Sequence, residues 1–510
     1  MQIKVKNETD GSILKNTFNT ICIWDFRMFS DDAMGGMPEG WYKQQFPFID
    51  YVILMTFTGG KGYNEWCSLE NGKLVCDFTT PIHIIENVLR QGVLPMIVTG
   101  NIPDALCTSV AESAVGWGNC SPPADYEMYY EYICEFAKAI KCAFREDVYK
   151  KFRFRIGTEM DNKDWFIGNE DDYLKLYDYT VDAFCSVLGD DIYIGPSNIS
   201  QIASLPNMLG HFANGINYRT GKIGSKCDFL SFSYYELAEP TMSTGFYRPV
   251  VNYMSERLNV YPQLNIKDLN VGEGQFLLDG GNPARRLLNA QDCTEYSASW
   301  HAQNFDISNK YGVSYFANWA YTCDLRLCRE SVVRTPAFYS ALVCSRLAGF
   351  ERLKLDFKEE KEGFVGCIAA KDKIGKCLYV LCYYHTFKRE CDSKLSFELN
   401  LSEFSLGKEY SICRIDADHN NFSKLWLSDS AKFERISHIH DNSFKTGSVY
   451  DTEISQTLEG DDLKFWKEWK KDYNSKEIDF EKAVLNNTDS VSVELSAHSV
   501  ALLEFTLSLN

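Results

Sequence analysis

Between residues 20 and 349, short β-rich runs alternate with segments of helical periodicity, and the alternation occurs eight times. Strands that alternate with helices form parallel βαβ units. Eight such units over about 320 residues predict a closed (β/α)8 barrel. The runs are expected to end near Trp24, Thr58, Gly100, Glu159, Ser197, Tyr235, Glu273 and Trp319.

The helical segments support this arrangement. Apolar residues lie three and four apart in two segments, DYEMYYEYICEFAKAIKCAF and DDYLKLYDYTVDAFCSVL, as in an amphipathic helix. The second segment begins with Asp171 and Asp172, and acidic residues favour a helix N-terminus. A doubly wound open sheet is the alternative. It lacks its usual marker, because no GxGxxG follows the first strand and no GxxxxGK[ST] occurs in the chain.

After about residue 350 the sequence pattern changes to short segments in which apolar and polar residues alternate, separated by polar turns. This pattern is typical of a β-sandwich. We therefore expect an α/β chain in which a catalytic barrel spans 20–349 and a β-sandwich accessory domain spans 350–510. Within residues 1–19, the run IKVKN predicts a strand that pairs with the sandwich. The one helix-like insertion in the sandwich region is DLKFWKEWKKDYNSKEIDFEKAVL.

Charge and composition exclude several classes of partner. The net charge is −18 and the pI is near 5.0, which argues against nucleic acid or an anionic membrane as partner. No stretch reaches about 18 uninterrupted apolar residues, so a membrane span is not expected. The first residues lack the apolar core of a secretion signal, and the 18 cysteines form no CxxC. We therefore expect a cytoplasmic protein whose cysteines are buried free thiols.

Two carboxylates stand where barrel chemistry is expected, because the loops after the strands build the active site of this fold. Glu159 ends the fourth run and Glu273 the seventh, so the two would face each other across the mouth. At about 5 to 5.5 Å apart, such a pair matches retaining glycoside hydrolysis, in which one carboxyl protonates the leaving oxygen and the other attacks the anomeric carbon. The alternative is structural, since acids at strand ends also cap helices or bind arginine. Glu236 is a third, weaker candidate.

Other chemistries have less support. The eight histidines do not cluster at strand ends, and the close pair His438 and His440 lies in the sandwich region. No lysine ends a strand, as a Schiff-base enzyme would need, and no Gly-x-Ser-x-Gly elbow occurs. We expect neither a metal nor an organic cofactor.

The fourth predicted strand and the segment after it read IGTEMDNKDWFIGNEDDYLKLYDYT. This segment resembles the acid/base strand of glycoside hydrolase family 39, a clan A family. In that family an Asn-Glu-Pro is followed by an aromatic pair and a Tyr-x-x-Leu-Tyr helix. MIVTGNIPDAL, IYIGPSNIS and CDFLSFSYYE resemble its third, fifth and sixth strands. YSICRIDADHNNFSKLW is similar to a distinctive stretch of its sandwich domain. The resemblance covers nearly the whole chain and implies that Glu159 is the acid/base and Glu273 the nucleophile.

The chain departs from the family pattern beside the acid/base. Thr158 replaces the family's Asn, Met160 its Pro and Ser233 its strand-six His, while Tyr235 matches the Tyr that follows. The Asn typically holds the 2-hydroxyl of the sugar, and a Thr hydroxyl reaches less far and offers one donor. We hypothesise that the sugar in the −1 subsite differs from xylose at C2, or that a neighbouring side chain replaces the Asn.

Further candidates for substrate binding lie at or just after the ends of the predicted barrel strands. Tyr235, with Tyr234 as the near alternative, is a candidate to hydrogen-bond the nucleophile. Candidates to stack on sugar rings are Trp165, Phe166 and Trp319, with Trp24 at the pocket floor, and candidates to bind hydroxyl groups are Asp25, Thr158, Asn162, Ser233 and Asn318.

The sequence thus predicts a retaining, exo-acting glycosidase for short oligosaccharides, β-xylosidase-like but with altered recognition of the 2-hydroxyl. Its partner is a glycoside, and a homo-oligomer stays open. One alternative is a barrel that binds carbohydrate without cleaving it. Another is a glycosidase for an arabinosyl, galactosyl, mannosyl or uronic-type sugar, for which Arg248, Arg285 and Arg286 would supply positive charge.

Overall fold

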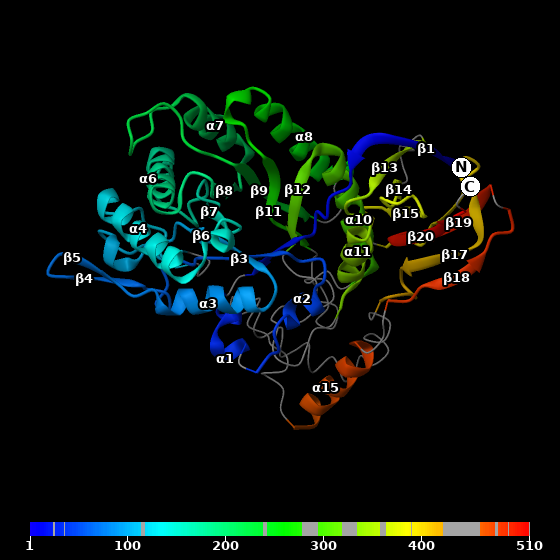
Figure 1. Ribbon diagram of the computed structural model, residues 1–510, viewed down its shortest axis with the longest axis horizontal. Helices are drawn as coiled ribbons and strands as arrows, with labels where there is room; N and C mark the ends of the chain where they lie inside the picture. The colour runs from blue at the N-terminus through cyan, green and yellow to red at the C-terminus, as the bar shows by residue number, and fades with distance from the viewer. Residues whose placement is uncertain are drawn as a thin grey trace.

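The computed structural model describes residues 1–23, 26–34, 36–113, 118–237, 242–277, 294–318, 334–357, 364–388, 390–421, 460–474, 478–487 and 489–508. The barrel and a large sheet lie side by side, and both chain termini are at the sheet end of the molecule (Figure 1).

Eight parallel strands close into a barrel in the order β11-β12-β2-β3-β6-β7-β8-β9. This confirms the predicted (β/α)8 barrel and excludes the open doubly wound sheet. The second strand ends at Leu54 rather than near Thr58, because Thr56 takes a left-handed conformation with φ 48° and turns the chain. The strands are β2 (Thr20–Ile23), β3 (Tyr51–Leu54), β6 (Leu94–Thr99), β7 (Arg153–Thr158), β8 (Tyr193–Ile199), β9 (Phe229–Leu237), β11 (Asp268–Leu277) and β12 (Val313–Asn318).

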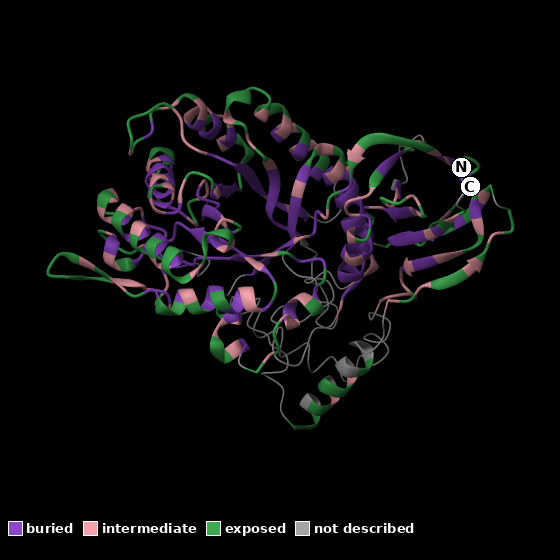
Figure 2. Cartoon of the chain, viewed as in Figure 1, coloured by how far each residue is buried: buried purple, intermediate pink, exposed green. Residues whose placement is uncertain are grey.

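Helices cover the outside of the barrel, with their buried faces turned to the strands (Figure 2). The predicted helix after β7 begins with a capping box: the Asn169 side chain accepts the Asp172 N–H at 2.9 Å, and the Asp172 side chain accepts the Asn169 N–H at 2.9 Å. The main helices of this layer are α3 (Thr79–Arg90), α4 (Tyr126–Ala143), α6 (Glu170–Leu188), α7 (Leu205–Asn214), α8 (Tyr247–Leu258), α10 (Glu295–Tyr311) and α11 (Pro336–Ser345).

Shorter elements fill the connections. A hairpin that the sequence analysis did not predict follows β3 and joins β4 (Cys67–Glu70) to β5 (Lys73–Cys76). Its turn residues Asn71 and Gly72 both have positive φ, as a two-residue hairpin turn requires. The remaining short helices are η1 (Phe26–Phe29), α1 (Asp31–Met34), α2 (Trp41–Gln45), η2 (Asp104–Leu106), α5 (Glu146–Tyr149), η3 (Ile202–Ser204) and η4 (Pro262–Leu264), and β10 (Ser243–Phe246) precedes α8.

The second part is a nine-stranded sheet in the order β18-β17-β20-β15-β14-β13-β1-β16-β19. The N-terminal strand β1 lies inside it, antiparallel to β13 and parallel to β16. Strands from the whole order contribute to one apolar core, so the sheet folds back on itself as the predicted β-sandwich. Its strands are β1 (Gln2–Ile13), β13 (Glu351–Asp356), β14 (Phe364–Lys371), β15 (Cys377–His385), β16 (Lys394–Asn400), β17 (Leu406–Ile415), β18 (Glu481–Val484), β19 (Ser490–Ser496) and β20 (Ser499–Leu507). The predicted helix-like insertion is helical only in its first part, α15 (Gly460–Asn474); its last residues form β18, because they pair with β17.

Helix α10 connects the two parts through buried polar contacts. Asp306 accepts hydrogen bonds from Arg352 at 2.5 Å and from the Tyr383 hydroxyl at 3.0 Å. The Ser299 hydroxyl lies 2.8 Å from Nδ1 of His385. Because these partners come from the barrel layer and from the sandwich, their geometry holds only while the two parts are packed together.

The cysteines within the described residues are all free thiols. Seven of them are buried, but Cys142 is exposed near the end of α4, so the expectation of general burial is wrong there. Cys293, Cys323 and Cys328 lie outside the described residues. Among the helices that the structure describes, none is long and apolar enough to cross a membrane.

Candidate active site

Glu159 directly follows barrel strand β7, and Glu273 lies within β11, which continues to Leu277 instead of ending near Glu273 as predicted; the two strands are three apart around the ring. Both carboxyl groups are buried, with exposed fractions of 8% for Glu159 and 3% for Glu273. A buried carboxylate is costly unless it is hydrogen-bonded. The contacts of these two side chains therefore decide whether they are structural or available for chemistry.

The backbone at Glu159 has an uncommon conformation. Its φ is 46°, in the left-handed region that non-glycine residues rarely adopt. The Glu159 N–H donates to the carbonyl of Asn198 on β8 at 3.1 Å, and its own carbonyl accepts the Asn162 N–H at 2.8 Å. Strained backbone that is held from both sides is frequent at functional sites.

Ser233 and Asn198 connect the two carboxyl groups. Ser233 is the register partner of Glu273 on the neighbouring strand β9, and its hydroxyl is hydrogen-bonded to the Glu159 carboxyl. The side-chain amide of Asn198 donates to the Ser233 oxygen at 2.5 Å, and Asn198 also lowers the pKa of Glu273. The fold therefore brings both glutamates to the same pair of polar side chains, as their positions in the sequence predict.

The two tyrosines at the end of β9 point in opposite directions. The Tyr235 hydroxyl donates to the carboxylate of Glu273. Tyr234 instead packs against Tyr247 and Trp300 in the helix layer, and its hydroxyl donates to Glu236. Of the two alternatives left open by the sequence, Tyr235 is the one beside the candidate nucleophile.

Glu236, the third candidate carboxylate, lies on the same outward face of β9 as Tyr234 and is 1% exposed. Burial raises the pKa of Glu236 to about 7, against hydrogen bonds from Tyr234 and the Phe246 backbone. Since side chains alternate along a strand, Glu236 and the inward-facing Tyr235 occupy different sides of the barrel wall. Glu236 is therefore not part of the Glu159–Glu273 pair.

The environment shifts the protonation of the pair. Burial raises the pKa of Glu273, and the charge of Glu159 raises it further, while hydrogen bonds from Tyr235 and Asn198 and the charge of Arg155 oppose the rise. Burial likewise raises the pKa of Glu159, against hydrogen bonds from Ser233 and Trp165. Two interacting buried carboxyl groups lose their protons in separate steps, so such a pair can hold one proton near neutral pH.

Other predicted binding residues have varied surroundings. The half-buried Trp165 is hydrogen-bonded to Glu159 and lies in the site. Phe166 is 1% exposed and packs against Tyr173 with a centroid distance of 6.4 Å, so it presents no face on which a sugar could stack. The Asn162 side chain accepts the Asp164 N–H at 3.0 Å and builds the loop instead of facing the pair.

At the end of β12, Asn318 is fully buried. Arg248 on α8 donates to the hydroxyl of Tyr311 at an exposed position on the helix layer, at 2.9 Å. The remaining candidates lie outside the described residues: Trp24, Asp25, Trp319, Arg285, Arg286, His438 and His440.

Two residues of the site were missed by the sequence analysis. Asn198 was read only as part of a strand end, and Arg155 only as part of the motif RIGTE. The Oγ1 atom of Thr158 accepts a hydrogen bond from Arg155 at 2.9 Å, so the residue that replaces the family's Asn is engaged inside the barrel. The available signal was the charge of Arg155 within an otherwise buried strand, four residues before Glu159.

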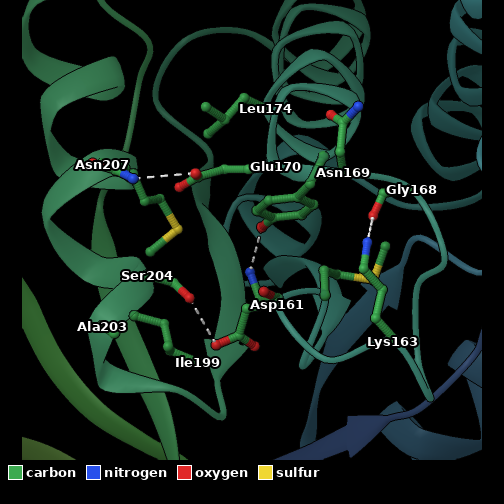
Figure 3. A pocket seen from close by; sticks show the side chains of 14 residues that line it. Asp161, Lys163, Gly168, Asn169, Glu170, Leu174, Ile199, Ala203, Ser204 and Asn207 are labelled. Atoms are coloured by element: carbon green, nitrogen blue, oxygen red, sulfur yellow. Dashed lines mark hydrogen bonds between the residues drawn. The ribbon is translucent and has the colours of Figure 1, made fainter.

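A cavity of about 310 Å³ lies behind the loop that follows Glu159, between that loop, α6 and α7 (Figure 3). The Asp161 carboxylate accepts the Gln201 N–H at 2.7 Å and the Ser204 hydroxyl at 3.3 Å, and Lys163 donates to the carbonyls of Ile167 and Gly168. These contacts anchor the loop to its neighbours. The cavity does not include the two glutamates of the pair.

The chain is similar in sequence and in fold to known glycosidases. The sequence profile described as Glycosyl hydrolases family 39 matches residues 63–260. A β-xylosidase of Caldicellulosiruptor saccharolyticus is 22% identical over 383 residues, which cover 70% of this chain and 74% of that protein.

Solved structures share the whole architecture. A monomeric β-xylosidase from Caulobacter crescentus CB15 has a TM-score of 0.72 at 14% identity and 99% coverage of both chains. A bacterial orthologue of human α-L-iduronidase has a TM-score of 0.69 at 11% identity, covering 100% of this chain and 84% of that one. With the profile match over residues 63–260 and the sequence relative, these findings support glycoside hydrolase family 39 as the family of this chain and indicate that it is a glycosidase.

Proposed function

We propose that this glycosidase acts by a retaining double displacement, with Glu159 as acid/base and Glu273 as nucleophile, and that it removes sugars from the non-reducing end of short oligosaccharides. The observation that carries the proposal is that the two buried glutamates act on each other's pKa and that the same two polar side chains, Asn198 and Ser233, which are hydrogen-bonded to each other, lower the pKa of one glutamate each. Relatives described as β-xylosidases support a β-xylosidase-like activity. We assign the chemistry to the barrel, residues 20–349, and place the enzyme in the cytoplasm, where short imported substrates occur.

In the first step the ionised Glu273 attacks the anomeric carbon while Glu159 transfers its proton to the departing oxygen, and a covalent glycosyl-enzyme forms. Burial and the charge of Glu159 raise the pKa of Glu273 to about 7; when Glu159 holds the proton its charge is gone, and the hydrogen bond from Tyr235 and the charge of Arg155 then favour the ionised form of Glu273 against burial. Such contacts favour a carboxylate over a carboxylic acid.

In the second step Glu159, now ionised, takes a proton from water, and the resulting nucleophile attacks the anomeric carbon and releases Glu273. The same residue thus serves as acid and then as base. The hydrogen bonds from Ser233 and Trp165 support its charged form in the glycosyl-enzyme. Configuration at the anomeric carbon is retained because it is inverted twice.

We also propose that the enzyme binds the C2 position of the sugar in the −1 subsite differently from a β-xylosidase that acts on xylose. Either the sugar differs from xylose at C2, or a side chain other than the family's Asn binds the 2-hydroxyl. The hydroxyl of Thr158 is hydrogen-bonded to Arg155, which limits what it can offer to a substrate. A panel of aryl β-xylosides, arabinosides, galactosides, mannosides and uronides tests this proposal. A clear preference for β-xyloside would contradict it.

The mechanism is tested by incubating the protein with activated 2-deoxy-2-fluoro glycosides of the same sugars and mapping the adduct by mass spectrometry. We expect a label on the peptide that contains Glu273, and none in Glu273→Gln. Glu236→Gln, which changes a buried glutamate on the other face of β9, is the matched control and should label normally. Absence of adduct and of hydrolysis with every sugar would instead support a non-catalytic carbohydrate-binding barrel.

A further inference from the structure

A guanidinium group lies in the interior of the barrel, beneath the two glutamates. Arg155 on β7 is 0% exposed. Its Nη1 donates to the carbonyl of Gly272 on β11 at 3.1 Å, and its Nη2 donates to Oγ1 of Thr158 at 2.9 Å. Gly272 directly precedes Glu273, and Thr158 directly precedes Glu159. One side chain therefore links the two positions from which the carboxyl groups project.

The space for this side chain depends on glycine. A Cβ added at Gly272 would lie 3.0 Å from Nη1 of Arg155 and 3.0 Å from Cβ of Asn198. Both distances are shorter than ordinary van der Waals contact. A larger residue before Glu273 would push against the guanidinium and against the amide that binds the nucleophile.

The charge of Arg155 has no partner in direct contact. Within the described part of the chain it forms no ion pair with a carboxylate, and its hydrogen-bond acceptors are a carbonyl, a hydroxyl and the sulfur of Met55. A buried cation without an anion nearby is strongly unfavourable. The carboxyl groups on which its charge acts are Glu159 and Glu273, and it lowers the pKa of both.

In the proposed reaction the negative charge moves from one glutamate to the other, so the positive charge of Arg155 would have to stabilise each of them in turn. Before the first step Glu273 carries the negative charge and Glu159 the proton. After that step Glu273 is a neutral ester and Glu159 is the anion. The pair carries one negative charge in both states, and a cation linked to both strand ends can balance that charge wherever it resides.

We propose that Arg155 is a positioning residue for the hydrolysis, which fixes the strand ends that carry Glu159 and Glu273 and supplies the counter-charge that keeps one of them ionised. This inference rests on the proposed function. It goes beyond it by assigning a role to a group that has no solvent-exposed surface and is linked to the residues that precede the two glutamates.

The experiment compares Arg155→Met and Arg155→Gln, which remove the charge, with Arg155→Lys, which keeps it. The readouts are the pH dependence of kcat/KM and of inactivation by the 2-fluoro glycoside, with thermal unfolding as the check on folding. We expect the acidic limb of both profiles to move up by about one pH unit in the neutral variants, because a lost favourable charge raises a carboxyl pKa. Arg155→Lys should keep the wild-type limb while kcat falls, on the order of tenfold, through the lost hydrogen bonds.

Arg153→Met is the matched control. Arg153 lies two residues earlier on the same strand, with its guanidinium 3.6 Å from the ring centroid of Tyr51, and it is not among the main causes that shift the pKa of either glutamate. This variant should leave the acidic limb unchanged. The control separates loss of one barrel arginine from loss of the charge below the pair.

Two results would overturn the inference, because either one indicates a purely structural role. The first is an equal loss of activity in all three Arg155 variants with an unchanged pH profile. The second is failure of both neutral variants to fold while Arg155→Lys folds. If the wild-type protein itself is neither labelled nor active, the proposed function has failed. If the wild type is labelled and the neutral variants keep its acidic limb, only the inference about Arg155 has failed.

Discussion

The side-chain amide of Asn198 donates a hydrogen bond of 2.5 Å to the hydroxyl of Ser233. Ser233 is in turn hydrogen-bonded to Glu159, and Asn198 to Glu273, so one short chain of polar contacts runs between the two carboxyl groups. A change at any member of this chain should alter the protonation of the pair. The first three predictions follow from that connection.

Glu159→Gln should separate the role of the acid from that of the nucleophile. General acid catalysis contributes about 10²–10⁴-fold, so hydrolysis of an unactivated disaccharide should fall by that order. The first step with a dinitrophenyl glycoside, whose leaving group needs no proton, should fall much less and appear as a burst of phenolate in stopped-flow measurements. An equal loss on both substrates would contradict the assignment, and Glu236→Gln is the control.

Ser233→Ala removes the hydroxyl bonded to Glu159. Because that hydrogen bond lowers the pKa of Glu159, its loss should raise the pKa of this acid. Activity is lost when the acid loses its proton, so the basic limb of the kcat/KM profile should move to higher pH. Ser231→Ala, on the same strand two residues earlier and without a hydrogen-bond partner for its hydroxyl among the described residues, should leave that limb in place.

Tyr235→Phe removes a donor to the nucleophile. A hydrogen bond to a charged group contributes about 1.5–3 kcal/mol, which corresponds to roughly a 10- to 100-fold loss in kcat/KM. The pKa of Glu273 should rise, because the bond lowers it, and the acidic limb should move to higher pH. Tyr234→Phe, which changes the outward-facing tyrosine, is the matched control; if it lost as much activity with the same shift, Tyr235 would have no special role.

Arg352→Met should destabilise the contact between α10 and the sandwich. Asp306 and Arg352 have side chains 3% and 8% exposed, and loss of one partner of a buried pair costs up to about 3–5 kcal/mol. We expect a value at the lower end of that range, because Lys310 still pairs with Asp306 at 3.1 Å. Arg414→Met removes one side of an exposed pair with Glu481 and should cost less than about 1 kcal/mol. Chemical denaturation measures both free energies of unfolding, and similar values for the two variants would refute the prediction.

The same contact predicts a dependence on pH. Burial alone would raise the pKa of Asp306, but Arg352 and Lys310 lower it below the usual value of 3.8. A carboxyl group whose pKa is lower in the folded state stabilises the fold above its unfolded pKa, and this contribution is lost as the pH falls below about 4. Unfolding free energies measured across this range should therefore decline less steeply with acid in Asp306→Asn than in the wild type.

Much of the architecture could be predicted from local pattern. The alternation of β-rich and helical segments is a property of neighbouring residues, so all eight barrel strands and the sandwich were predicted, as was the place of Glu159 at a strand end; β11, however, continues four residues past Glu273. The parallel barrel brings the carboxyl ends of its strands together whatever their separation in the chain. The meeting of the two glutamates therefore follows from the predicted fold.

Tertiary structure alone decided which side chains serve the pair. Tyr234 and Tyr235 differ by one position, and a shift of one residue turns a side chain to the other face of a strand, which residue types do not specify. Phe166 belongs to the core, and Asn198 and Arg155 reach the site from inside the barrel wall. These contacts join strands far apart in the chain, so they arise only when the ring closes, and no local pattern encodes them.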